Sequence, residues 1–408
     1  MARQGGGLMR GGPRRARLSL LAAGLGAAVL AAALAAGVLV SVLHGPAPPA
    51  VPAAMGVQGL HVQGRQIVNG RGRPVVLTGF NNAGAEYACE DGWGIFDKPR
   101  GTTLSSVVAG MRTWAGANAV RLPVNEQCWL GLPGLNPAYS GAPYRHAIEQ
   151  YVALLTSHGF AVILDLAGTA PDGERALNEE EMPDSSSVAF WRSAAAVFLR
   201  NSSVLFDLFN EPWPLRNADA PAAWACWRDG GCTETSQNGG ERYRAVGMQQ
   251  LVDVVRSTGA RNIVIAEGIQ YAADVGRWLE YRPRDPAGNL IASVHVYSYN
   301  PCSALRCYNG AMRQVAAHVP LLIGEFGPDV IVSQSVLASD GSCPASDIGS
   351  AGFDRTLLGW ARRNGASWTA WTWNAWEGAC WSLIRSFDGT PTSPYGVMIK
   401  SALARWRD

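Results

Sequence analysis

The sequence predicts an α/β fold, an eight-stranded parallel (β/α) barrel of the TIM type, preceded by an N-terminal hydrophobic helix. Eight short apolar runs rich in β-branched residues alternate with helix-compatible stretches after residue 57. Their near-continuous hydrophobicity is typical of parallel strands that helices cover. The chain has 408 residues, of which 48% are hydrophobic and 16% charged, so it can form one large core.

The N-terminal end has the composition of a membrane-targeting segment. Residues 1–17 carry five arginines and no acidic residue, and residues 18–43 contain only two polar side chains, Ser19 and Ser41. As a helix, residues 18–43 would span roughly 39 Å, which exceeds a bilayer core of about 30 Å. We expect an uncleaved membrane anchor with a cytoplasmic N-terminus and an extracytoplasmic remainder. A cleaved signal segment, which would release a secreted protein, is the alternative.

A Pro/Ala-rich linker, residues 44–56, is expected to separate this segment from a barrel domain over residues 57–408. The formal net charge is +2, but the five N-terminal arginines account for more than this excess. The rest of the chain has 29 basic and 32 acidic residues, so it lacks the basic footprint that a nucleic-acid partner requires. We expect a monomer with no nucleic-acid partner.

Eight cysteines, an even number, agree with export into an oxidising compartment. No C-x-x-C pair or paired His spacing occurs, so we expect no structural metal site. Cys226 with Cys232 and Cys302 with Cys307 could each close a short loop. The sequence leaves the pairing of the other four open; Cys89 with Cys128 and Cys343 with Cys380 is the arrangement that we adopt.

The reactive groups of such a barrel lie at the C-terminal ends of its strands. A doubly wound sheet would have a Gly-rich phosphate-binding turn after its first strand, and Gly79-Phe80-Asn81-Asn82 is no such turn. In chain order the expected strands are Val75–Phe80, Ala119–Pro123, Ala161–Leu166, Val204–Asn210, Asn262–Glu267, Ile291–Tyr297, Pro320–Glu325 and Ser367–Thr372.

Two of these strands run directly into a glutamate. Glu211 follows the fourth strand and Glu325 ends the seventh. An acid at the end of an apolar strand is partly desolvated, which prepares it for proton transfer. Two acids facing each other across a barrel mouth are what glycoside hydrolysis requires, because one protonates the departing oxygen and the other attacks the sugar or activates water.

The neighbours of the two glutamates occur in a specific order. The sequence contains Arg121 in Ala-Val-Arg-Leu-Pro, Asn210-Glu211-Pro212, His295-Val-Tyr297, Ile-Gly-Glu325 and Trp368-Thr-Ala-Trp371-Thr-Trp373. This order resembles glycoside hydrolase family 5, the cellulase-type retaining glycosidases, over about residues 57–408. The segments Glu86-Tyr87-Ala-Cys89 and Gly92-Trp93-Gly-Ile-Phe96 are similar to a bacterial secreted branch of that family.

The resemblance implies a role for each matching residue. Glu211 would be the acid/base and Glu325 the nucleophile of an exported, endoglucanase-like enzyme that cleaves β-1,4-linked glucan with retention. Asn210 would bind the sugar 2-hydroxyl, and Arg121 and Tyr297 would keep Glu325 ionised and oriented. His295 would lie beside the acid/base, and Trp371 would form the floor under the reacting sugar. No metal and no organic cofactor is expected.

One position departs from the family pattern. Members usually end the third strand with Asp-Leu-His, whereas this chain has Asp165-Leu166-Ala167. Ala167 cannot hydrogen-bond a sugar through its side chain. A cell-surface carbohydrate-binding pseudoenzyme with impaired catalysis is therefore an alternative function, and a β-mannanase or another β-glycosidase of the same family is a second alternative.

Several other side chains fall near the expected barrel mouth. Glu267 ends the fifth strand, where we favour an ion pair over a third catalytic carboxylate. Asp165 and Asp207 lie within strands and are expected in a hydrogen-bonded interior layer. The aromatic faces of Trp129, Trp213 and Trp376 are candidate sugar platforms, because aromatic rings stack on pyranoses.

Overall fold

The computed structural model describes residues 56–171, 174–217, 219–300, 302–328, 350–376 and 381–406. The expected cytoplasmic segment 1–17, the apolar segment 18–43 and all of the linker except Gly56 lie outside these ranges. Among the helices that the model does describe, none is both long enough and apolar enough to cross a lipid bilayer.

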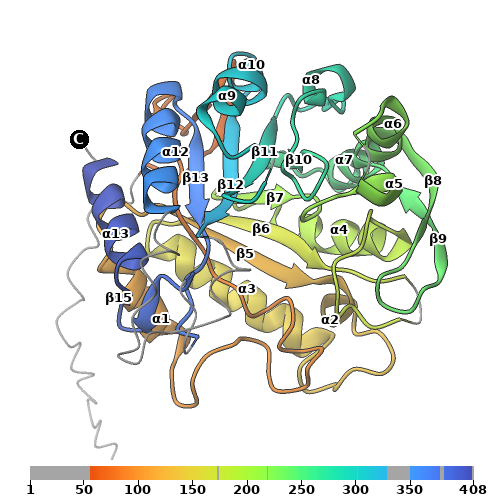
Figure 1. The fold of residues 1–408 in the computed structure, drawn as a ribbon. Helices are drawn as coiled ribbons and strands as arrows, with labels where there is room; N and C mark the ends of the chain where they lie inside the picture. Colours follow the sequence, from red (N-terminus) through yellow and green to blue (C-terminus); the bar gives the residue numbers. More distant parts are fainter. Residues whose placement is uncertain are drawn as a thin grey trace, which may run out of the picture. The chain divides into compact units, whose positions relative to one another are not determined.

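Eight parallel strands close into a barrel, which confirms the predicted fold (Figure 1). Each strand pairs with the barrel strand that precedes it in the chain, and the last strand pairs with the first. The barrel strands are β4 (Thr78–Asn81), β5 (Ala119–Asn125), β6 (Ala161–Gly168), β7 (Val204–Asp207), β10 (Val264–Glu267), β11 (Leu290–Tyr297), β12 (Leu321–Gly327) and β13 (Ser367–Ala370).

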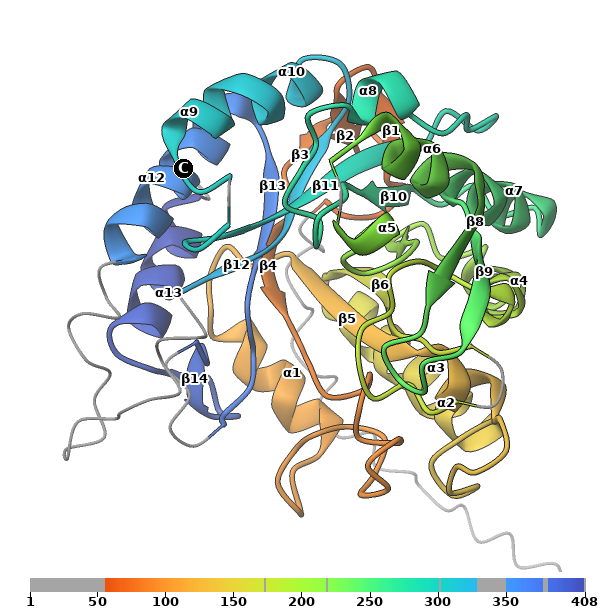
Figure 2. The same cartoon turned by 45° about the vertical axis from the view of Figure 1, so that its right-hand side comes forward.

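Helices surround the barrel, as the two views in Figures 1 and 2 show. The longer ones begin with recognisable signals: Thr103 and Asp184 cap helices with their side chains, and proline stands near the start of two others. The helices are α1 (Leu104–Arg112), α2 (Glu126–Leu130), α3 (Ala142–Ser157), α4 (Ser185–Phe198), α5 (Pro214–Asn217), α6 (Pro221–Asp229), α7 (Met248–Ser257), α8 (Trp278–Tyr281), α9 (Leu305–Cys307), the π-helix η1 (Tyr308–Met312), α10 (Arg313–Ala316), α12 (Ser350–Asn364) and α13 (Tyr395–Trp406).

Three small antiparallel sheets complete the described structure. The first joins β1 (His61–Gln63), β2 (Gln66–Val68) and β3 (Pro74–Val75), the second joins β8 (Gly230–Thr235) and β9 (Arg242–Val246), and the third joins β14 (Ile384–Ser386) and β15 (Thr390–Pro391). The expected first strand, Val75–Phe80, is therefore wrong as one element. Val75 pairs with Ile67 of β2, and the chain changes sheets before β4 begins.

An apolar layer fills the N-terminal end of the barrel. Inward side chains such as Ile163, Leu205 and Ile265 pack there against Val57 and Ile67, which come from the segment around the first small sheet. The outward side chains of the strands pack against the helices in a second, larger core. This division leaves the opposite, C-terminal end of the barrel for polar residues.

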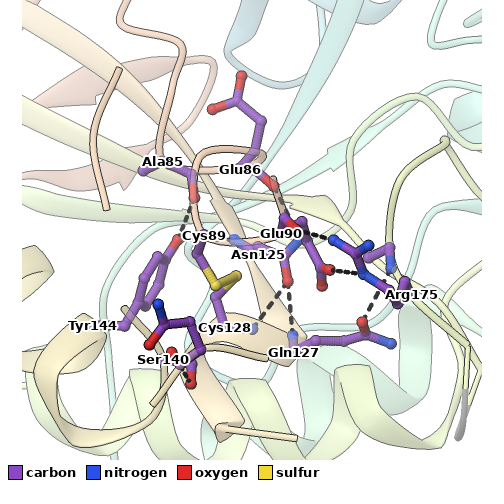
Figure 3. Close-up of a disulfide and its surroundings, with 12 residues drawn as sticks. Ala85, Glu86, Cys89, Glu90, Asn125, Gln127, Cys128, Ser140, Tyr144 and Arg175 are labelled. Atoms are coloured by element: carbon purple, nitrogen blue, oxygen red, sulfur yellow. Dashed lines mark hydrogen bonds and ion pairs between the residues drawn. A yellow bond between two sulfur atoms is a disulfide. The ribbon is translucent and has the colours of Figure 1, made fainter. Parts of the chain in front are cut away.

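A disulfide between Cys89 and Cys128 ties the loop after β4 to helix α2 (Figure 3). Close by, Asn125 accepts hydrogen bonds from the backbone N–H groups of Gln127 and Cys128 at 2.9 and 3.0 Å, and so caps α2. Two further disulfides, Cys226–Cys232 and Cys302–Cys307, close short loops. The expected pair Cys343–Cys380 lies outside the described residues.

The Cys89–Cys128 disulfide closes a loop of 39 residues. In the loop-entropy treatment, the double substitution Cys89→Ala/Cys128→Ala should lower the free energy of unfolding by about 4 kcal/mol. The matched control Cys302→Ala/Cys307→Ala, which opens a separation of 5 residues, should cost about 2 kcal/mol. Urea unfolding of both variants under non-reducing conditions measures the difference. An equal loss in both would contradict the loop-length argument.

Candidate active site

Strand alternation points a set of charged side chains into the barrel. Ala119, Ile163, Leu205 and Ile265 belong to the apolar interior layer, and successive side chains of a strand point to opposite faces. The residues two positions further along each strand therefore also face inward, one layer closer to the C-terminal end. These residues are Arg121, Asp165, Asp207 and Glu267.

Arg121 is fully buried at the centre of this layer. Its guanidinium contacts Asp165 at 2.9 Å, Asp207 at 3.0 Å, Glu267 at 3.0 Å and Glu325 at 2.7 Å. Burial opposes its charge, but these four carboxylates outweigh burial and raise the pKa of Arg121 further. Arg121 is therefore a permanent positive charge that ties five strands together.

The carboxyls around Arg121 differ in their affinity for protons. Burial raises the pKa of Asp165 and of Asp207 well above the usual value, and the guanidinium offsets this effect only in part. For Glu267 burial acts in the same direction, but the positive charges of His295 and Arg121 prevail and lower its pKa to about 2. The interior layer therefore holds Glu267 ionised, as the ion-pairing partner that the sequence favoured.

A bulge in β12 turns Glu325 toward Arg121. Val294 pairs with Ile323, but His295 pairs with Glu325, so Gly324 is an extra residue between them. A Cβ on Gly324 would lie 2.7 Å from the Ser293 hydroxyl oxygen, so no larger residue fits the bulge without a shift. Because of this bulge Glu325 faces inward, although strict alternation from Leu322 would place it outside.

The two carboxylate oxygens of Glu325 have separate donors. Oε1 accepts a hydrogen bond from Arg121 Nη1 at 2.7 Å, and Oε2 accepts one from the Tyr297 hydroxyl at 2.8 Å. Asn81 accepts a second bond from Arg121 Nη1 at 3.1 Å and donates to the Gly324 carbonyl at 3.0 Å. Glu325 is thus oriented from both sides.

Glu211 lies beside the ring of His295. Its Oε1 is 2.6 Å from His295 Nδ1, and His295 Nε2 is 2.9 Å from Glu267. Burial opposes a charge on the imidazole, but the carboxylates of Glu267 and Glu325 outweigh burial and raise the pKa of His295 well above its usual value. His295 is therefore a cation: its Nδ1 hydrogen-bonds Glu211, and its Nε2 forms an ion pair with Glu267.

The backbone at Glu211 is in an uncommon conformation. Its φ is 52°, in the left-handed region that costs a non-glycine residue of order 1 kcal/mol. The backbone N–H of Glu211 donates to Glu267 Oε2 at 2.6 Å, which holds this conformation. Burial raises the pKa of the Glu211 carboxyl, although His295 lowers it in part.

The carboxyls of Glu211 and Glu325 face each other across a short gap. One oxygen of each and a ring nitrogen of His295 all lie within 4.8 Å of one another. A metal ion would suit this spacing, but an imidazole that is protonated on both nitrogens offers no lone pair to it. Among the described residues, the acidic trio of Asp165, Asp207 and Glu267 also has metal-like spacing, and the guanidinium of Arg121 already occupies its centre.

Asn210 has a fixed amide orientation. Its Oδ1 accepts a hydrogen bond from Arg121 Nη2 at 2.9 Å, so its amide N–H groups remain as donors toward the barrel mouth. Arg121, Asn210, Glu211, His295, Tyr297 and Glu325, all expected from the sequence, are thus connected by hydrogen bonds and ion pairs in one cluster.

The aromatic residues divide into buried and accessible ones. Trp129, a candidate sugar platform, is fully buried and packs edge-on against Phe190, so it cannot stack on a sugar. The prediction that Trp129 is a sugar platform is therefore wrong, because Trp129 lies in helix α2 and not in a loop at the barrel mouth. Trp371 and Trp376 are half-buried, and Trp376 donates to Asp97 at 2.7 Å. Trp213 is buried except for 9% of its surface and stacks on Tyr271.

Ala167 occupies a bulge at the end of β6. Val124 pairs with Leu166 and Asn125 pairs with Gly168, so Ala167 is the extra residue. It is half-buried, and its methyl group offers no hydrogen bond. Asp172, which could have reached the site from the following loop, lies outside the described residues.

Sequence reasoning missed two acidic residues near the cluster. Glu86, in the loop after β4, is half-buried, and desolvation raises its pKa to about 8. Glu179, in the loop between β6 and α4, accepts a hydrogen bond from Asn210 Nδ2 at 3.5 Å. The only signal for Glu179 in the sequence is its place in the run Glu179-Glu180-Glu181.

Comparisons with known proteins agree with the barrel fold. A family model described as cellulase (glycosyl hydrolase family 5) matches residues 68–377. A β-mannanase from Thermomonospora fusca is 19% identical over 85% of this chain and 95% of its own, with a TM-score of 0.58. A β-glucanase from Saccharophagus degradans in complex with cellotetraose is 18% identical over 86% of this chain and 94% of its own, with a TM-score of 0.61. An endocellulase from Pyrococcus horikoshii is 17% identical over 85% of this chain and 99% of its own, with a TM-score of 0.59.

The substitution Arg121→Met tests the charge balance of the cluster. Without the guanidinium, Asp165 and Asp207 lose the partner that lowers their pKa values, so the folded state should bind protons more tightly than the unfolded state does. The free energy of unfolding of the Arg121→Met variant should then decrease as pH rises. We expect a loss of about 3–5 kcal/mol at pH 8 and a smaller loss at pH 5, measured by urea unfolding.

Arg277→Met is the matched control for this change. Arg277 forms an exposed pair with Glu280, and such pairs contribute about 0–1 kcal/mol. A loss in Arg121→Met no greater than in this control, or a loss that grows on acidification, would refute the assigned charge balance.

Proposed function

Since the chain belongs to glycosyl hydrolase family 5 and is a glycosidase, we propose that it is an endo-acting enzyme that cleaves β-1,4-linked glucan with retention of configuration. Glu325 is the nucleophile and Glu211 is the acid/base. The observation that carries this proposal is that one carboxyl oxygen of Glu211 lies within 4.8 Å of one carboxyl oxygen of Glu325. Retaining glycosidases have their carboxyls about 5–5.5 Å apart, whereas inverting enzymes need about 6.5–9.5 Å to admit a water.

The environments of the two carboxyls support different roles. Glu325 accepts hydrogen bonds from Arg121 and Tyr297, which stabilise its ionised form and leave it no proton to donate. Glu211 is desolvated, which raises its pKa and favours the protonated form that a general acid needs. Two residues of the same type are thereby set to opposite tasks, as glycoside hydrolysis requires.

In the first step, Glu325 attacks the anomeric carbon while Glu211 donates its proton to the departing glycosidic oxygen. The bond from the anomeric carbon to that oxygen breaks, and a covalent glycosyl-enzyme ester forms. The Asn210 amide donates to the sugar 2-hydroxyl, a hydrogen bond that strengthens as positive charge develops on the ring. Trp371 lies under the reacting sugar.

In the second step, the ionised Glu211 removes a proton from water, and the water oxygen attacks the anomeric carbon. The ester to Glu325 breaks, and both carboxyls return to their starting states. His295 stays protonated through both steps and keeps Glu211 in place. Water is the only reactant besides the glycan that the two steps require.

Ala167 keeps a second function open, a carbohydrate-binding pseudoenzyme. The missing side-chain contact would weaken binding of one sugar hydroxyl by about 1–3 kcal/mol. The intact cluster around Arg121, Glu211 and Glu325 favours the enzyme, because a protein kept only for binding has no need of two closely spaced carboxyls with opposite environments. A β-mannanase remains the alternative within the family, and the structural neighbours include both β-glucanases and β-mannanases.

We further propose that the enzyme works outside the cytoplasm as a monomer. The apolar segment 18–43 with its flanking arginines would hold it at the membrane, or a cleavage would release it. The disulfides Cys89–Cys128, Cys226–Cys232 and Cys302–Cys307 support an oxidising compartment.

A panel of polysaccharides tests the proposed activity. The purified full-length chain should release reducing ends from cellulose oligomers and mixed-linkage glucan faster than from mannan and xylan. The variant Glu325→Gln should lose about 10⁴-fold or more of this activity while it still folds. Preference for mannan would select the β-mannanase alternative, and binding without hydrolysis of any glycan would select the pseudoenzyme.

Chemical trapping and rescue test the two roles. A 2-deoxy-2-fluoro glycoside with a good leaving group should label Glu325, as read by peptide mass spectrometry. Glu211→Ala should reduce hydrolysis of cellotetraose by about 10²–10⁴-fold but should cleave a 2,4-dinitrophenyl glycoside and form a β-glycosyl azide when azide is added. Label on another residue, or an α-glycosyl azide, would overturn the assignment.

A further inference from the structure

Glu179 reaches the proposed acid/base from a distant loop. Its carboxyl accepts a hydrogen bond from Asn210 Nδ2 at 3.5 Å and forms a side-chain hydrogen bond with the carboxyl of Glu211. Two carboxyls can form such a bond only when one of them carries a proton. Glu179 is exposed to solvent, so it can exchange that proton with water.

The segment around Glu179 is held on both sides by hydrogen bonds. Asn238, in the turn of the β8–β9 hairpin, accepts bonds from the backbone N–H groups of Leu177 and Asn178 at 2.7 Å each. On the other side, Glu180 accepts a bond from the Ser236 hydroxyl at 2.7 Å. The position of Glu179 is therefore fixed by the hairpin and not by chance packing of a free loop.

The same segment is also tied to the residues that follow Glu211. The backbone N–H of Trp213 donates to the Glu181 carbonyl at 3.0 Å. At its other end the hairpin is linked to α6 by the Cys226–Cys232 disulfide. Glu179 and Glu211 are thus positioned by elements that contact each other directly.

The groups that face Glu211 come from four parts of the fold. They are His295 and Tyr297 of β11, Glu325 of β12, Glu267 of β10 with Tyr271 in the loop after it, and Glu179. His295 alone among these groups is positively charged, whereas Glu325 and Glu267 are negative. Although part of Glu179 is exposed, desolvation of its carboxyl by the surrounding protein, followed by the negative charges of Glu211 and Glu325, raises the pKa of Glu179 well above its usual value.

We propose that Glu179 is a positioning residue for the acid/base and that the carboxyls of Glu179 and Glu211 share one proton. This inference rests on the proposed role of Glu211. The shared proton keeps Glu211 able to donate to the glycosidic oxygen even though His295 beside it favours the ionised carboxylate. The bond to Asn210 places Glu179 between the acid/base and the group that binds the sugar 2-hydroxyl.

The proposal predicts a shift of one limb of the pH profile. The basic limb of kcat/KM reports ionisation of the acid/base in the free enzyme. In Glu179→Gln the amide keeps the shape and the acceptor for Asn210 but cannot share the proton. We expect the basic limb for cellotetraose, or for mannotetraose if the panel favours mannan, to move to lower pH by about one unit. The acid limb should stay in place.

Leaving-group dependence separates this role from a merely structural one. A 2,4-dinitrophenyl glycoside departs without protonation, so Glu179→Gln should cleave it with kcat/KM within about twofold of the unmodified enzyme. Glu179→Asp, which retains a carboxyl, should restore part of the basic limb. Glu149→Gln on α3 removes the same charge away from the barrel mouth and should leave the profile unchanged.

The outcomes are distinguishable. An unchanged basic limb in Glu179→Gln, in an enzyme whose Glu211→Ala variant shows azide rescue, overturns this inference and leaves the proposed function standing. Azide rescue in Glu179→Ala would make Glu179 itself the acid/base and would also overturn the inference. If the unmodified chain hydrolyses no glycan of the panel, the proposed function and the inference fall together.

Discussion

The buried guanidinium of Arg121 meets carboxylates from four other barrel strands at 2.7–3.0 Å. A lone charge at this depth would be very unfavourable, and so would four unpaired acids. Each partner is therefore tolerated only because the others are present. Through this cluster Arg121 orients Glu325 directly, Asn210 through its amide oxygen, and Glu211 through Glu267. The positions of the other polar side chains in the cluster therefore depend on Arg121.

The same charge cluster makes two glutamates chemically unequal. Arg121 and Tyr297 supply hydrogen-bond donors to Glu325. Glu211 instead lies near the negative charges of Glu267 and Glu325. Each ring nitrogen of His295 faces a carboxylate. The proposed division of roles between acid/base and nucleophile thus follows from the neighbours of the two glutamates and not from residue type.

The barrel and its loops contribute different things. The strand ends supply the charged cluster, and the disulfide-linked loops surround it. Ala167 in its bulge offers no side-chain hydrogen bond. The loop that follows brings Glu179 to Asn210, next to the proposed acid/base, and the β8–β9 hairpin holds this loop. Loop changes of this kind alter sugar contacts and proton affinity while the strands that carry the chemistry stay as they are.

Local features of the sequence, the apolar runs and the strand-terminal acids, were enough to predict the barrel strands after the first one and the pair Glu211 and Glu325. Arg121, Asn210, His295 and Tyr297 followed from the order of motifs that resembles the family. The sequence could not determine which side Glu325 faces, since the extra residue Gly324 reverses the alternation, or that Trp129 is buried in a helix. It also gave no sign that Glu179 meets Asn210, 31 residues further along the chain. These features depend on strand register and on loop packing between segments that are far apart in the chain, so they follow from the folded structure and not from any local pattern.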